Sequence, residues 1–134
     1  MNIGKLNIGV GFLFLAGFML YGFILIYLRD FAQGKEEWIL GSLTGPHFES
    51  KLAHVHGNLF ALLNIVIGFL LMNVSFSVRD SIWISRLALT GMLMPIGILS
   101  EVLFGLPPYL VILGGISIVI SAAWFGIAIL KLRK

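Results

Sequence analysis

The sequence contains no cysteine and few charged residues. Without cysteine, disulfides, thiolate metal ligands and cysteine nucleophiles are excluded. Charged residues make up 11% of the 134 residues, against about a quarter in ordinary soluble domains. Hydrophobic residues make up 59%. A chain of this length has too large a surface to hide such an apolar fraction from water, so lipid is its expected solvent.

Four long apolar runs predict helices over about residues 6–28, 52–74, 82–106 and 109–130. Each run has roughly the twenty residues that a helix needs to cross a ~30 Å hydrocarbon core. Helices satisfy every backbone polar group internally, which lipid requires. Short connections make neighbouring helices antiparallel. The sequence therefore predicts an all-α polytopic membrane protein, a single domain built as an up-down bundle of four transmembrane helices.

Local signals add detail to this bundle. Residues 29–51 form the one substantial loop, in which residues 36–40 could form a short interfacial helix. Pro95 and Gly97 predict a kink in the third helix, because proline interrupts helical hydrogen bonding. Small residues let helices approach closely in lipid. Such residues, with one asparagine, recur at helical spacing on the second helix: Gly57, Ala61, Asn64 and Gly68.

The distribution of basic residues predicts the orientation in the membrane. Of the nine Lys and Arg residues, six fall on the side of the two termini: Lys5, Arg79, Arg86, Lys131, Arg133 and Lys134. Three fall on the other side: Arg29, Lys35 and Lys51. The positive-inside rule then places both termini in the cytoplasm, and we expect a bacterial inner membrane. Because the basic residues are explained by orientation in the membrane, we expect the lipid bilayer as partner and no nucleic acid.

Polar and ionisable side chains within the apolar runs are the candidate functional residues, because burying them in lipid is costly. His54, His56 and Asn58 lie near the outer start of the second helix, and Glu101 lies near the outer end of the third. In an antiparallel pair these depths are similar, so one layer of the bundle is expected to hold all four. His54 and Asn58 share a helix face. His56 points about 200° away from His54, which argues against one metal ion between the two histidines.

Haem is the cofactor that this pattern favours. One histidine suffices as an axial ligand, and an apolar helical wall suits a porphyrin. His54 is the predicted metal ligand, with His56 as the alternative, and Gly57 would leave room for a flat ring. Asn64 is predicted to contact the cofactor or to hydrogen-bond a neighbouring helix. The competing interpretation is that both histidines are only interfacial polar residues.

Asn58 and Glu101 are the predicted catalytic residues, which would orient or protonate a substrate. Glu101 has a second interpretation, in which it caps the interface or pairs with a cation such as Lys51. His47, which follows Gly45-Pro46, is predicted to be a solvated loop residue.

These residues resemble the hydroxylaminobenzene mutase and styrene oxide isomerase group of four-helix membrane proteins. That group carries an Ala-His-x-x-Gly or Ala-His-x-Gly signature on its second helix, followed by Leu-Asn, and here residues 53–57 read Ala-His-Val-His-Gly with Leu63-Asn64 beyond. The resemblance implies a homotrimer with haem b between subunits and His54 as axial ligand. It also implies a redox-neutral rearrangement of an epoxide or related oxygen to a carbonyl. Phe60 stands where the family has an asparagine, so the scaffold and the ligand match better than the chemistry.

Three functions stay open on the sequence. The first is a haem-binding membrane isomerase for a small apolar substrate such as an epoxide. The second is a non-catalytic haem or electron-transfer membrane subunit, whose iron would carry two axial ligands. The third is a membrane accessory protein without a cofactor.

Overall fold

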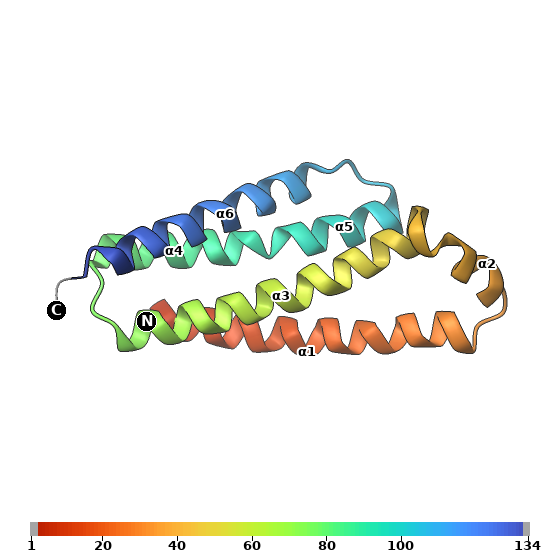
Figure 1. The fold of residues 1–134 in the computed structure, drawn as a ribbon, viewed down its shortest axis with the longest axis horizontal. Coiled ribbons are helices and arrows are strands. Elements are labelled where there is room, and N and C mark those ends of the chain that lie inside the picture. The colour runs from red at the N-terminus through yellow and green to blue at the C-terminus, as the bar shows by residue number, and fades with distance from the viewer. Residues whose placement is uncertain (1–2, 133–134) are drawn as a thin grey trace.

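The computed structural model describes residues 3–132 and consists almost entirely of helix (Figure 1). Arg133 and Lys134, which contribute to the predicted orientation, lie outside the described residues. Four segments are long and apolar enough to cross a membrane. The helices are α1 (Ile3–Asp30), α2 (Lys35–Leu40), the 3-10 helix η1 (Gly41–Leu43), α3 (Gly45–Asn73), α4 (Val78–Gly91), α5 (Leu93–Phe104) and α6 (Tyr109–Leu130).

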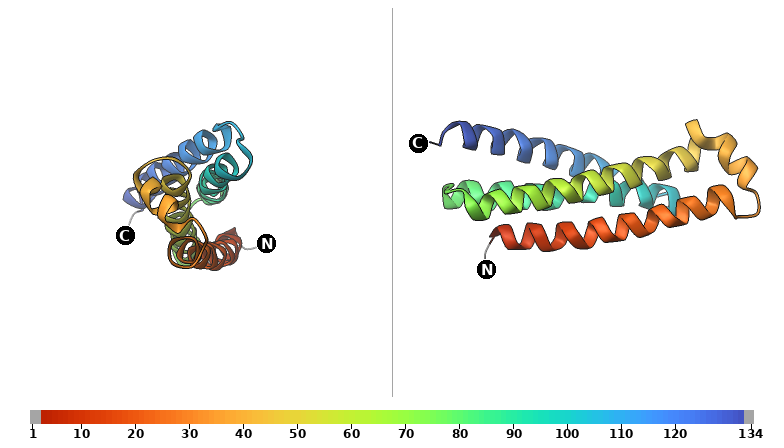
Figure 2. Two further views of the ribbon diagram at one scale, coloured as in Figure 1. Left: turned by 90° about the vertical axis from the view of Figure 1, so that its right-hand side faces the viewer. Right: turned by 60° about the horizontal axis from the view of Figure 1, so that its bottom comes forward.

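The long helices form an up-down bundle with α1 and α6 at opposite edges (Figures 1 and 2). Helix α3 packs against α1 on one side and against α4 and α5 on the other, and α6 packs against α4 and α5. Large apolar side chains cover the outside, as expected of a surface that faces lipid. The predicted all-α integral membrane protein with four transmembrane helices is confirmed. Both ends of the described chain lie at one end of the bundle, and we call the opposite end the outer end.

The third transmembrane segment is broken at Met92 into α4 and α5. Pro95 has no N–H to donate to the carbonyl of Gly91, and its ring crowds that carbonyl. The Met92 N–H instead donates to the carbonyl of Leu89, at 3.1 Å. Gly114 of α6 packs directly on the backbone at the start of α5, where a side chain would collide. At the position of the predicted kink, α4 and α5 are separated by the single turn residue Met92, which keeps helical dihedral angles (φ −62°, ψ −16°).

The predicted long loop is mostly helical, which corrects the boundaries expected from the sequence. Helix α1 runs to Asp30, and α3 begins at Gly45 rather than near residue 52. Pro46 lies in the first turn of α3, where its missing N–H costs no hydrogen bond. The short helix expected over residues 36–40 is confirmed as α2. Together α2 and η1 fold across the outer ends of α1 and α3 (Figure 1).

A buried polar network joins α1, α3 and α4. The side-chain amide of Asn7 donates to Oδ1 of Asn64 at 2.9 Å and to the carbonyl of Ser85 at 3.3 Å. The Ser85 hydroxyl donates to Oδ1 of Asn7. Nδ2 of Asn64 donates to the carbonyls of Phe60 and Ala88, both at 3.0 Å. The network satisfies both ends of the Asn64 amide, as a polar group buried in lipid requires.

The stripe of small residues on α3 lies against α1, as predicted. Gly68 meets the backbone of Gly4, and Gly11 sits on the backbone at Ala61. Further out, the ring of Phe18 lies flat on Gly57. The glycines therefore let the two helices approach to backbone contact over their inner halves.

Replacing Asn64 with leucine removes the centre of the polar network. We expect Asn64→Leu to lower the free energy of unfolding by about 1–2 kcal/mol, because interhelical hydrogen bonds in membranes have that magnitude. Steric trapping in bicelles measures this change. The control is Asn73→Leu, since Asn73 bonds only to Phe69 of its own helix. Equal destabilisation by the two variants would contradict a structural role for the network.

Candidate functional site

The main cavity of the bundle is a groove of about 790 Å³ between the outer halves of α1 and α3. We call it the α1–α3 groove. Apolar residues of α1 form one wall: Leu15, Met19, Phe23 and Ile26. Ile39 and Ser42 close the outer end from α2 and η1. Met19 is 58% exposed on the lipid-facing surface, so the groove is accessible from the bilayer.

The opposite wall is a polar ridge on α3 formed by His47, Lys51, His54 and Asn58. Their spacing of four, three and four residues places them on one side of a helix. The sequence predicted the His54–Asn58 half of this ridge. Lys51 and His47 were missed because the helix was expected to begin at residue 52. The signal that reveals them is Gly45-Pro46, since proline favours the first turn of a helix.

His54 faces α1. Its Nε2 lies where a side chain on Gly22 would begin, 2.7 Å from the ideal Cβ position, and its ring centroid is 6.4 Å from that of Tyr21. Within residues 3–132, neither ring nitrogen of His54 has a hydrogen-bond partner. Glycine at position 22 is therefore what lets the imidazole enter the helix contact and border the groove.

Asn58 brings an unsatisfied acceptor to the same wall. Its Nδ2 donates to the backbone carbonyl of His54 at 2.9 Å, which fixes the orientation of the amide. Its Oδ1 is buried and has no partner among the described residues. A buried acceptor without a donor is costly, so this atom is suited to accept a hydrogen bond from a bound molecule.

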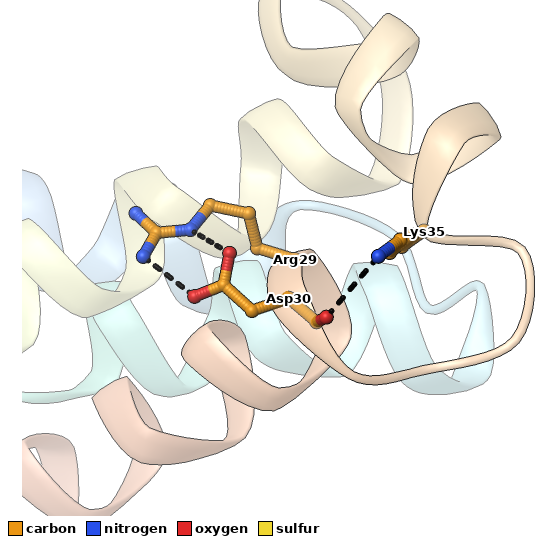
Figure 3. Close-up of polar contacts among 3 residues, drawn as sticks. All are labelled: Arg29, Asp30 and Lys35. Carbon is orange, nitrogen blue, oxygen red and sulfur yellow. Dashed lines mark hydrogen bonds and ion pairs between the residues drawn. The ribbon is translucent and has the colours of Figure 1, made fainter.

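Two cations, Arg29 and Lys51, line the outer end of the groove. Figure 3 shows the Arg29 guanidinium held by the neighbouring carboxylate of Asp30, through Nε at 2.9 Å and Nη2 at 2.8 Å. Nη1 has no hydrogen-bond partner among residues 3–132. The Lys51 ammonium donates to the backbone carbonyl of Ser42 at 2.6 Å. In the described part of the chain, the Arg29–Asp30 contact is the one salt bridge. Lys51 therefore has no carboxylate partner, and the predicted pairing with Glu101 is wrong.

His47 is part of the groove rather than a solvated loop residue, which corrects the expectation from the sequence. It is only 9% exposed, and its ring stacks on Trp38 with centroids 4.5 Å apart. Its Nδ1 lies 2.5 Å from the carbonyl oxygen of Trp38. The stack attaches α2 to α3 and so holds the cover over the outer end of the groove.

The remaining predicted site residues lie elsewhere. Nδ1 of His56 is 2.9 Å from the carbonyl oxygen of Leu52, and its ring packs edge-on against Phe60. Glu101 is half-buried on α5, its carboxylate makes no hydrogen bond or ion pair with other described residues, and it does not line the groove. Over residues 3–132, no three His, Asp or Glu side chains come together to hold a metal ion. The single polar layer expected from the sequence is therefore not assembled in one chain.

Gly57 and Asn64, the other two residues predicted to contact a cofactor, contact protein side chains in this structure. The flat ring that packs against Gly57 is Phe18 of α1. Asn64 is fully buried in the network with Asn7, so it has no free polar group for a cofactor. Its alternative interpretation, a hydrogen bond to a neighbouring helix, is confirmed.

Comparison with protein-family models, curated proteins and solved structures finds no match for this chain. The resemblance to the hydroxylaminobenzene mutase and styrene oxide isomerase group thus stays a prediction. The geometry of the groove and of the nearby histidines is the basis of the proposed function.

A methyl group at position 22 tests the placement of His54. We expect Gly22→Ala to push the imidazole away from α1, because the new Cβ would lie 2.7 Å from Nε2. The His54 ring signals in a ¹H–¹⁵N correlation spectrum should then shift. Gly17→Ala is the matched control on the same helix, since a Cβ there meets no atom within 4 Å. Unchanged His54 signals in Gly22→Ala would contradict the contact.

Proposed function

We propose that this protein is a membrane-embedded isomerase that takes a small apolar substrate from the bilayer into the α1–α3 groove. The observation that carries the proposal is the pair of unpartnered polar groups on the groove wall, the His54 imidazole and the buried Oδ1 of Asn58. Small-molecule sites combine an apolar cavity of about 300–1,000 Å³ with a few convergent polar groups. The volume and lining of the groove match that description.

His54 can supply acid–base catalysis for a redox-neutral rearrangement of an epoxide. Because Nε2 lies against Gly22, Nδ1 of the imidazolium would give a proton to the epoxide oxygen as one C–O bond opens. A hydride then moves from the carbon that keeps the oxygen to the carbon that lost it. The proton returns from oxygen to His54, and the product is the isomeric carbonyl compound. Asn58 would orient the ring-opened intermediate, whose new O–H can donate to Oδ1.

Haem does not fit His54 as this chain places it. The Nε2 atom lies against the backbone of Gly22, so a porphyrin cannot reach that nitrogen while α1 and α3 stay packed. His56 fits better, because its Nδ1 can donate to the carbonyl of Leu52 and leave Nε2 free. Metal-binding histidines commonly donate their other nitrogen to a backbone carbonyl in this way. A haem-binding isomerase or electron-transfer subunit is therefore the second candidate, with His56 as ligand and ferric iron as a Lewis acid or electron carrier.

The assembly and the location are part of the same proposal. We propose a homo-oligomer, a trimer by the resemblance, in a bacterial inner membrane with both termini in the cytoplasm. The excess of Lys and Arg at the end of the bundle that holds the termini supports this orientation.

Filling the groove tests the first candidate. We expect wild-type protein to convert an aryl epoxide to the isomeric aldehyde, and Met19→Trp to lower kcat/KM by about tenfold or more, since the indole would occupy space the substrate needs. Gas chromatography of the product measures the rate. Ile112→Trp is the control, because Ile112 is similarly exposed on α6 but lies outside the groove. A wild-type protein without turnover, or equal rates in the two variants, would contradict the proposed site.

An absorption spectrum of the purified protein supplied with haem tests the second candidate. We expect a Soret band, if one forms, to be lost in His56→Ala and kept in His54→Ala, because Nε2 of His54 lies against Gly22 whereas His56 has only its Nδ1 at a backbone carbonyl. Loss in His54→Ala alone would contradict the assignment of the ligand. No band in any sample would exclude haem and leave the acid–base isomerase or a cofactor-free accessory protein.

A further inference from the structure

We infer that the substrate of the α1–α3 groove is a single-chain amphiphile with a carboxylate head group, held by Lys51 and Arg29 at the outer end. The inference rests on the proposed function and names the class of its substrate. The proposed chemistry at His54 and Asn58 does not use the two cations at the outer end of the groove, Arg29 and Lys51.

The charge at this end matches a monoanion. Asp30 neutralises one of the two cations, through the side-on contact with Arg29 (Figure 3). Lys51 has no carboxylate within salt-bridge distance among residues 3–132, and no acidic side chain lines the groove. Lys51 is exposed and Arg29 is 58% exposed, so the two cations lie at the rim of the apolar groove, where they favour an anionic head group over a cationic one. A carboxylate of the ligand, bound by the Lys51 ammonium and by Nη1 of Arg29, would complete the site.

The groove extends from this head-group site toward His54 and Asn58. Apolar side chains of α1 form the wall that would face an alkyl chain. Lys51, His54 and Asn58 follow one another inward along the same ridge. The helical rise puts His54 about 5 Å and Asn58 about 10 Å from Lys51 along the axis. The amphiphile therefore carries its oxygen function partway along the chain, at the depth of His54 and Asn58.

A single acyl chain suits the groove better than a bilayer phospholipid or a second protein copy. The cavity of about 790 Å³ lies within the range of small-molecule sites, which suits one acyl chain better than the two chains of a phospholipid. Asn58, whose buried Oδ1 has no partner among the described residues, lines the groove two helical turns inward from Lys51, and an aliphatic helix face would offer that atom no donor. A chain with an internal oxygen can supply the missing donor when that oxygen is a hydroxyl.

Thiol protection tests the inference, because the chain has no cysteine of its own. Met19→Cys places one thiol in the groove, and the rate of its modification by N-ethylmaleimide is measured in phosphatidylcholine nanodiscs. Three twelve-carbon probes are compared: dodecanoate, dodecanol and dodecyltrimethylammonium. We expect dodecanoate to protect at about tenfold lower concentration than dodecanol, since one hydrogen-bonded charge pair has that worth. The cationic probe should not protect, and Ile112→Cys should be insensitive to all three.

Substituting Lys51 distinguishes binding of the carboxylate head group from binding of the alkyl chain. In the Met19→Cys background, Lys51→Gln should remove the advantage of dodecanoate but keep protection by dodecanol, which shows that the groove still folds. Lys51→Arg should restore the advantage. Lys131→Gln, at the opposite end of the bundle, should leave it unchanged.

Each other outcome overturns a defined part of the argument. Equal protection by dodecanoate and dodecanol would refute the head-group site while leaving the proposed groove intact. No protection by any probe would refute both. If phosphatidylglycerol in the nanodiscs protected the Met19→Cys thiol as well as dodecanoate does, the site would be assigned to bulk lipid. A thiol already shielded without probe, and exposed when the oligomer dissociates, would assign the groove to a second copy of the chain.

Discussion

The fold depends on one buried contact, the hydrogen-bonded network of Asn7, Asn64 and Ser85. Between helices in lipid there is no hydrophobic driving force, so close packing and polar links must supply the attraction. This network joins three of the four transmembrane segments at a fixed register. Because its groups are satisfied only in that register, sliding α1 along α3 would leave amides unpaired in a medium that cannot solvate them.

The network and the small residues near it explain where the groove lies. At the inner half, Gly4 and Gly68 bring α1 and α3 into backbone contact. At the outer half, ring side chains such as Phe18 and His54 stand between the same two helices, and α2 covers the end through the stacked Trp38 and His47. Between α1 and α3, the apolar groove therefore lies at the end of the bundle opposite the termini. There the proposed substrate can keep its charged head in contact with water.

The sequence predicted the four spans because hydrophobic length is a strong signal, and it predicted a disturbance of the third helix because Pro95 cannot donate a helical hydrogen bond. It misplaced the start of α3, since residues 45–51 are polar and hydropathy cannot separate an amphipathic helix end from a loop. That one error hid Lys51 and His47 and left half of the polar ridge unrecognised. Glu101 was expected beside the histidines from its depth alone, which says nothing about the face of the bundle on which a side chain lies.

The sequence by itself determined the solvent, the number of crossings and the residues that are costly to bury, because each of these follows from the composition of a short stretch. Only the tertiary structure decided which of those residues meet. It separated His54 from His56 by packing one against Gly22 of α1 and tying the other to Leu52. It also placed Arg29 and Lys51 at the same end of one groove. The physical reason is that these contacts join residues far apart in the chain, through helix rotations and crossings that no local pattern encodes.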